Sequence, residues 1–178
     1  AVGIYSTKPG WQRALQPIVD FCVGRRIHPD TFIYGALVLS LIAALSLYYA
    51  GTNHILLWAV PPCVLIRLLL NLMDGQVARA LNLADDWGEV KNEFGDRIAD
   101  AIIFIAIGLS GYADTGLAFI ALTLILFVSY LGILGKAAGG SRVYGGVFGK
   151  GDRMVSLAIF TLYPALSGNL PAYDYYLV

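Results

Sequence analysis

The chain is poor in charged residues. Asp, Glu, Lys and Arg make up 13% of its 178 residues, whereas 58% are hydrophobic; an ordinary soluble domain has about 25% charged residues. This composition excludes intrinsic disorder and argues against a soluble enzyme with a hydrated surface. The 12 basic residues balance the 12 acidic ones, so the chain lacks the positive charge expected of a protein whose main partner is nucleic acid.

Cysteine is scarce as well. Cys22 and Cys63 are the only two, and Cys63 lies in an apolar run, so the sequence implies no disulfide framework. The first residues contain neither an initiator methionine nor a signal-peptide pattern. We therefore expect the numbering to begin inside a longer gene product.

Long apolar runs dominate the rest of the sequence. A helix that crosses a bilayer needs about 20 mostly apolar residues. Five runs are predicted as spans and the final residues as the start of a sixth: 31–51, 54–80, 92–111, 116–136, 151–168 and 170–178. We expect one all-α membrane domain over residues 1–178, a bundle of six transmembrane helices whose sixth is truncated.

Residues 8–27 have a different pattern. Apolar residues recur there at helical spacing with polar residues between them, which predicts an amphipathic helix lying in the membrane interface. Pro29 and Asp30 follow and are typical of a helix start, with Asp30 or Thr31 as the capping residue. The neighbouring His28 is interpreted as an interfacial residue rather than a ligand.

Lys and Arg are confined to one set of connections. They precede the first span and follow the second and fourth, while the other short connections contain none. The positive-inside rule therefore places the N-terminus and both charged segments in the cytoplasm, at a prokaryotic inner or plasma membrane. Arg67 alone lies inside a span, near enough to one end that we expect it to reach the interface.

Acidic residues gather where the second and third spans meet the cytoplasm. Asn71 and Asp74 share one helical face, and Glu93, Asp96 and Asp100 share another. A carboxylate at this depth is costly unless it is paired, metal-bound or hydrated. Converging oxygen ligands without matching lysines indicate divalent cations such as Mg²⁺, Mn²⁺ or Ca²⁺ rather than zinc.

Two other interpretations of these acids stay open. Arg79 and Arg97 could neutralise them in structural salt bridges, although membrane helices gain little from buried ion pairs. A cation-coupled transporter would also place acids within a membrane. That second interpretation predicts internal repeats, and the acidic pattern occurs only once in the sequence.

The stretch from Asn71 to Asp100 resembles the signature of the CDP-alcohol phosphotransferase (CDP-alcohol phosphatidyltransferase) family. That signature reads D-x-x-D-G-x-x-A-R, then about eight residues, then G-x-x-x-D-x-x-x-D. The matching residues are Asp74, Gly75, Ala78, Arg79, Asp96 and Asp100. The resemblance implies the family's membrane fold of six helices with an interfacial N-terminal helix, and it suggests a homodimer.

The sequence departs from the signature in two places. Asn71 replaces the leading Asp, and the spacer before Asp96 is longer. Either one helical turn is inserted after Gly88, or Asn92 stands where the family has Gly. An inserted turn nearly preserves the helical face, so Glu93 would join the acidic side and could restore the charge that Asn71 lacks.

The resemblance implies a reaction and a set of roles. The family moves a phosphatidyl or similar group from a CDP-alcohol such as CDP-diacylglycerol to an acceptor hydroxyl, with release of CMP, in phospholipid biosynthesis. Two Mg²⁺ or Mn²⁺ ions would clamp the pyrophosphate. The implied metal ligands are Asn71, Asp74, Asp96 and Asp100, with Glu93 as a further candidate. Asp100 is also the implied catalytic base. The implied CDP-binding residues are Gly75, Ala78 and Arg79, with Gly88 and Asn92 as further candidates.

A basic, glycine-rich segment precedes the fifth span. Its G-K-x-D-R portion resembles a basic stretch of phosphatidylglycerophosphate and phosphatidylinositol-phosphate synthases. This suggests a pocket for an anionic acceptor such as glycerol 3-phosphate or inositol phosphate, formed by Lys136, Arg142, Lys150 and Arg153. The positive-inside rule explains the same charges without a site. A small cation-binding transporter or an inactive relative remains the alternative to an enzyme.

Overall fold

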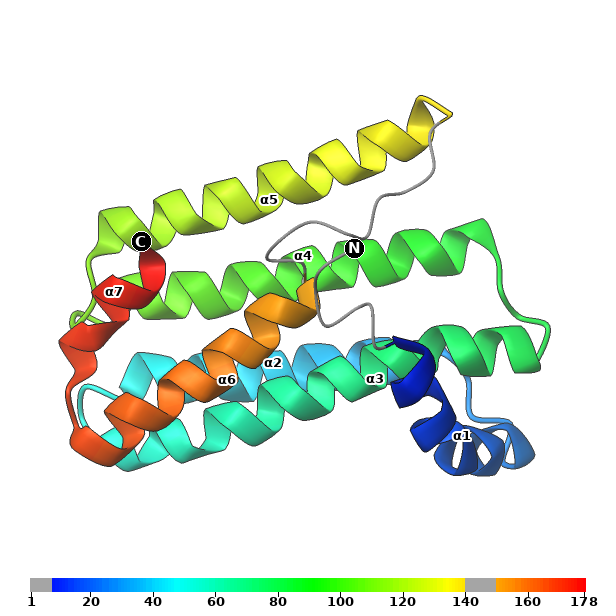
Figure 1. The fold of residues 1–178 in the computed structure, drawn as a ribbon, viewed down its shortest axis with the longest axis horizontal. Coiled ribbons are helices and arrows are strands. Elements are labelled where there is room, and N and C mark those ends of the chain that lie inside the picture. Colours follow the sequence, from blue (N-terminus) through cyan, green and yellow to red (C-terminus); the bar gives the residue numbers. More distant parts are fainter. Residues whose placement is uncertain (1–7, 140–149) are drawn as a thin grey trace.

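The computed structural model describes residues 8–139 and 150–178, and over these ranges the chain is helical without a strand (Figure 1). The main helices are α1 (Lys8–Gly24), α2 (Asp30–Tyr49), α3 (Val60–Ala80), α4 (Asp86–Leu109), α5 (Thr115–Ala137) and α6 (Lys150–Ser167). The shorter elements are the 3₁₀ turns η2 (His54–Ala59) and η3 (Leu170–Ala172) and the helix α7 (Tyr173–Leu177). The predicted all-α class is confirmed.

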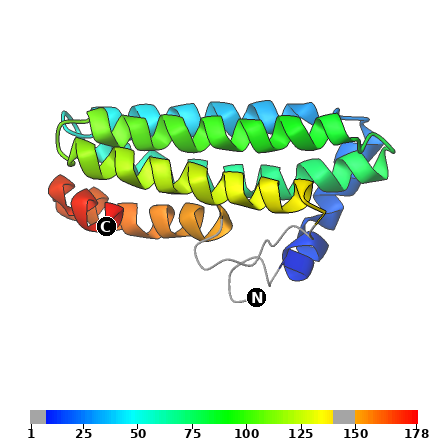
Figure 2. The same cartoon turned by 90° about the horizontal axis from the view of Figure 1, so that it is seen from above.

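The four helices α2 to α5 run side by side along the long axis of the molecule (Figures 1 and 2). Helix α2 packs on both α3 and α4, α4 packs on α5, and α6 packs on α3. Helix α1 crosses one end of this bundle at a steep angle and packs on α3 (Figure 2). That end is where α3 leads into α4, so α1 closes over the segment that carries the acidic residues.

Helix α1 is amphipathic, as its residue pattern predicts. Leu15, Val19 and Cys22 are buried and form a small core with residues of α3, whereas Ile18 and Phe21 are at least half exposed. The exposed pair gives the helix a second apolar surface, of the kind that inserts between lipid headgroups.

Three helical stretches are long and apolar enough to cross a membrane: Asp30–Tyr49, His54–Ala80 and Thr115–Ala137. On α5, large apolar side chains such as Leu124, Phe127 and Leu131 are about 60% exposed. A hydrated helix would carry polar residues at these positions, so this surface is suited to lipid tails. In the second stretch, Pro61 and Pro62 stand in the first turn of α3, where a missing N–H costs no hydrogen bond.

Helix boundaries depart from the predicted spans at two points. Helix α4 starts at Asp86, six residues before the predicted start at 92, because Asp85 caps it by accepting a hydrogen bond from the Gly88 N–H at 2.6 Å. The final residues form η3 and the five-residue α7. Tyr173 of α7 is fully buried, and its hydroxyl donates to Thr161 Oγ1 of α6 at 3.0 Å.

Gly108 sets the approach of α4 to α5. A Cβ placed there would lie 3.0 Å from the Ala118 Cβ, which is tighter than most Cβ contacts in proteins. Gly108→Leu should therefore separate the two helices and lower the free energy of unfolding by about 1–3 kcal/mol. Gly135→Leu on α5 is the matched control, because its added side chain meets no atom within 4 Å. Thermal unfolding in detergent compares the two variants, and equal midpoints would contradict this account of the helix contact.

Candidate active site

A cavity of about 830 Å³ lies at the end of the bundle where α3 leads into α4, and helices α1 to α6 all contribute to its wall. It brings together every described site residue that the sequence predicts, except Asp100. The residues concerned are Asn71, Asp74, Gly75, Ala78, Arg79, Gly88, Asn92, Glu93, Asp96, Lys136, Lys150 and Arg153. Arg142 lies outside the described residues.

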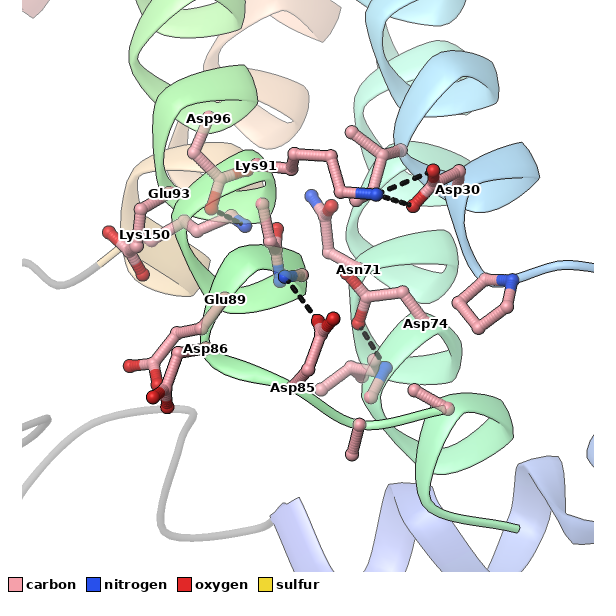
Figure 3. Close-up of a pocket in the computed structure, with 18 of the residues that line it drawn as sticks. Asp30, Asn71, Asp74, Asp85, Asp86, Glu89, Lys91, Glu93, Asp96 and Lys150 are labelled. Carbon is pink, nitrogen blue, oxygen red and sulfur yellow. Dashed lines mark hydrogen bonds and ion pairs between the residues drawn. The ribbon is translucent and has the colours of Figure 1, made fainter. Parts of the chain in front are cut away.

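The α3 wall of the cavity presents one helical face. Asp74 is 5% exposed, and Gly75 and Ala78 follow it on the same side (Figure 3). A Cβ at Gly75 would lie 3.3 Å from Arg79 Nη1, so the absence of a side chain leaves room for the guanidinium to lie along the helix. A guanidinium in this position can bind a phosphate with two parallel hydrogen bonds.

On α4, one residue per helical turn lines the cavity: Gly88, Asn92 and Asp96. The Asp96 carboxylate, 5% exposed, forms an ion pair with the Lys150 ammonium at the start of α6 (Figure 3). Its other oxygen lies 3.9 Å from Arg67 Nη2. Asp96 therefore faces the cavity while two cations hold its negative charge.

Asp100 lies one turn deeper and does not line the cavity. Its carboxylate accepts from Arg67 Nη2 at 2.9 Å and from Arg153 Nη2 at 3.1 Å, and Arg97 Nη1 is 3.8 Å away. Both oxygens thus contact arginines from neighbouring helices. The predicted roles of Asp100 as base and metal ligand stay predictions, and in this structure its contacts are those of a buried ion-pair network.

Arg67 does not reach the membrane interface as expected. It is 1% exposed, and its guanidinium points across the bundle to Asp100 on α4. The expectation was wrong because the Asp100 carboxylate and the Asp96 main-chain carbonyl lie within hydrogen-bond distance of Arg67 Nη2 inside the bundle, so the guanidinium finds its partners there.

The premise that these acids lack matching lysines is wrong for Asp96, which pairs with Lys150. Two further carboxylates of the cavity also pair with lysines, Asp30 with Lys91 and Glu89 with Lys136. In residues 8–139 and 150–178, no three His, Cys, Asp or Glu side chains are grouped closely enough to hold a metal ion. Asp74, with the amide oxygens of Asn71 and Asn92, still provides ligands of the type that Mg²⁺ prefers.

Residues 26–175 match the family described as CDP-alcohol phosphatidyltransferase. The chain belongs to this family. Inner membrane protein YnbA of Escherichia coli is 29% identical over 163 residues, which are 92% of this chain and 81% of that protein. Archaetidylinositol phosphate synthase of Pyrococcus horikoshii is 24% identical over 159 residues, 89% of this chain and 82% of that protein.

A solved structure shares the fold of this chain. It is the crystal structure of Mycobacterium tuberculosis phosphatidylinositol phosphate synthase with CDP-DAG bound. The TM-score is 0.69 at 23% identity, and the match covers 93% of this chain and 88% of that one. Together with the long apolar helices, these similarities identify a membrane protein with the fold of the family.

Among the cavity residues that sequence reasoning missed are His28 and Asp30. Each carboxylate oxygen of Asp30 accepts a hydrogen bond from Lys91 Nζ at 2.6 Å (Figure 3). Asp30 was expected to cap α2, but no side-chain cap bond forms at that end of the helix. The only signal for its actual partner was the excess of acids near Lys91, which does not specify a pairing between two helices.

The network around Asp100 should make a large contribution to stability. Asp100→Asn leaves Arg67 and Arg153 buried without their anion, which should lower the free energy of unfolding by about 3–5 kcal/mol. Glu89→Gln is the matched control, because its pair with Lys136 is 41–51% exposed and should contribute below about 1 kcal/mol. Unfolding of both variants in the same detergent measures the difference, and equal losses would show that the Asp100 network is not structural.

Proposed function

We propose that this chain transfers a phosphatidyl group from a CDP-alcohol, such as CDP-diacylglycerol, to the hydroxyl of an inositol phosphate and releases CMP. Family membership supports the CDP-alcohol donor. The relative named archaetidylinositol phosphate synthase supports the acceptor. Glycerol 3-phosphate is the acceptor to compare with it. The observation that carries the proposal is the single cavity that joins the D-G-x-x-A-R face of α3 to the basic start of α6.

The donor would lie along α3. Gly75 and Ala78 are small and line the cavity, so a nucleotide can approach the helix backbone there, and Arg79 can hold its phosphates. Gly88 lines the same cavity from α4. The cavity lies at one end of the apolar bundle, so the acyl chains of the donor can stay beside the lipid-facing helices. This arrangement, with the lysines and arginines around it, supports an active site on the cytoplasmic side.

The acceptor would enter from the α5 and α6 side. Its oxygen forms a bond to the phosphorus of the phosphatidyl group as the bond from that phosphorus to CMP breaks, and its proton goes to a carboxylate. We propose Asp96 for this role in place of Asp100, because Asp96 lines the cavity. The ion pair with the Lys150 ammonium orients the Asp96 carboxylate.

A divalent cation, Mg²⁺ or Mn²⁺, fits beside Asp74 and the Asn71 amide oxygen. When bound, it would neutralise charge on the pyrophosphate and favour departure of CMP. Glu93 is not proposed as a replacement for the charge that Asn71 lacks. In Figure 3 the Glu93 carboxylate projects to the side of α4 away from Asn71.

Release of labelled CMP from CDP-diacylglycerol tests the function and the base together. The unmodified chain should release CMP with inositol phosphate, and Asp96→Asn should lower kcat by roughly 10²–10⁴-fold, the usual contribution of a positioned base. Asp100→Asn, compared at a temperature where it is still folded, should retain most of the activity. No release with inositol phosphate or glycerol 3-phosphate would refute the transferase. The reverse order of the two variants would reinstate Asp100 as the base.

Lys136 should contribute to the affinity for the acceptor. Lys136 lies at the α5 edge of the cavity in a half-exposed ion pair with Glu89. An incoming phosphate can replace the Glu89 carboxylate as the partner of the Lys136 ammonium. Lys136→Gln should raise the KM for the anionic acceptor by roughly tenfold, the equivalent of one charge-assisted hydrogen bond. Lys91→Gln is the matched control, a lysine paired with Asp30 on the α2 side of the cavity. Steady-state kinetics with each substrate varied measures both KM values. An equal rise of the acceptor KM in the two variants would contradict this role of Lys136.

A further inference from the structure

The family signature fits this chain without any insertion. Eight residues separate Arg79 from Gly88, as the signature requires, and intervals of four then lead to Asn92 and Asp96. Helix α4 is continuous through all three positions. On this alignment Asn92 occupies the third acidic position of the signature and Asp96 the fourth, while Asp100 lies one turn beyond its end.

The structure favours this alignment over an inserted turn. Asn71, Asn92 and Asp96 line one small recess between α2, α3 and α4, and all three also line the main cavity, whereas Asp100 lines neither. The amide nitrogen Nδ2 of Asn71 and the amide oxygen Oδ1 of Asn92 are buried with no hydrogen-bond partner among the described residues. A buried polar atom of this kind costs free energy unless a ligand or water satisfies it.

Two of the four acidic positions are therefore amides in this chain. Asp74 and Asp96 carry the remaining negative charges, and Asp96 already faces the Lys150 ammonium and the Arg67 guanidinium. Two divalent cations a few ångströms apart repel each other strongly and need several carboxylates to hold them. The donor set at these positions fits one such ion and not two.

We propose that the site takes a single divalent cation, on the Asp74 side, and that the Lys150 ammonium supplies the positive charge beside Asp96 where a second ion would otherwise bind. This proposal rests on the proposed function for the reaction that the ion would assist. The number of ions bound is a separate property of the site. Asn71 and Asn92 are then the residues that limit the number of bound ions.

The test is the number of Mn²⁺ ions bound per chain, measured by titration with electron paramagnetic resonance on the full chain in detergent. The unmodified chain should bind one ion at the site. Asp74→Asn should lose that ion. The double variant Asn71→Asp with Asn92→Asp should bind two.

Asn53→Asp is the matched control for the double variant. Asn53 caps η2 by accepting from the Ile55 N–H at 3.0 Å, and Asp caps equally well, so this variant should still bind one ion. Two ions in the unmodified chain, no ion in it, or one ion in the double variant would each overturn the proposal. CMP release is measured separately, so a chain that binds two ions and still releases CMP refutes the single-ion site while the transferase stands.

Discussion

The ion pair between Arg67 and Asp100 is the interaction on which the site depends. Arg67 comes from the middle of α3, Asp100 from α4, and Arg153 from the first turn of α6 completes the contact. All three side chains are less than 10% exposed. Removal of one partner would leave the remaining buried charges unbalanced, which costs more than never burying them. These contacts fix the positions of α3, α4 and α6 relative to one another along the bundle axis, next to the cavity.

The position of α4 along the bundle axis determines what each of its carboxylates can do. Asp96 lies one turn above Asp100 on the same helical face. Because Asp100 contacts the arginines, Asp96 is raised to the level of Lys150 and the cavity, and Asn92 is raised to the level of Asn71. A shift of α4 by one turn would exchange these roles. The network below the site therefore determines which carboxylate the substrates would meet.

Much of this arrangement could be predicted from the sequence, and the rest could not for a physical reason. Apolar runs located the helices, and the intervals between Asn71, Asp74 and Arg79 placed those residues on one face, because both inferences need only local geometry. The ion-pair partner of Arg67 and the position of Asp100 below the cavity depend on how three separate helices pack. Spacing shows that Asp96 and Asp100 share a face, but it does not show which of them meets a neighbouring arginine.

The cations around the cavity differ in how readily they can change partners. Arg153 is held by the buried carboxylate of Asp100, so its transfer to a substrate phosphate would break a buried ion pair that the substrate would have to replace. Lys136 pairs with Glu89 in a half-exposed position, where water screens both ions and the pair contributes little. An anionic acceptor can therefore displace Glu89 from Lys136 at small cost. The balanced charge of the chain is compatible with an anionic substrate because some of its ion pairs are structural and others are open to exchange.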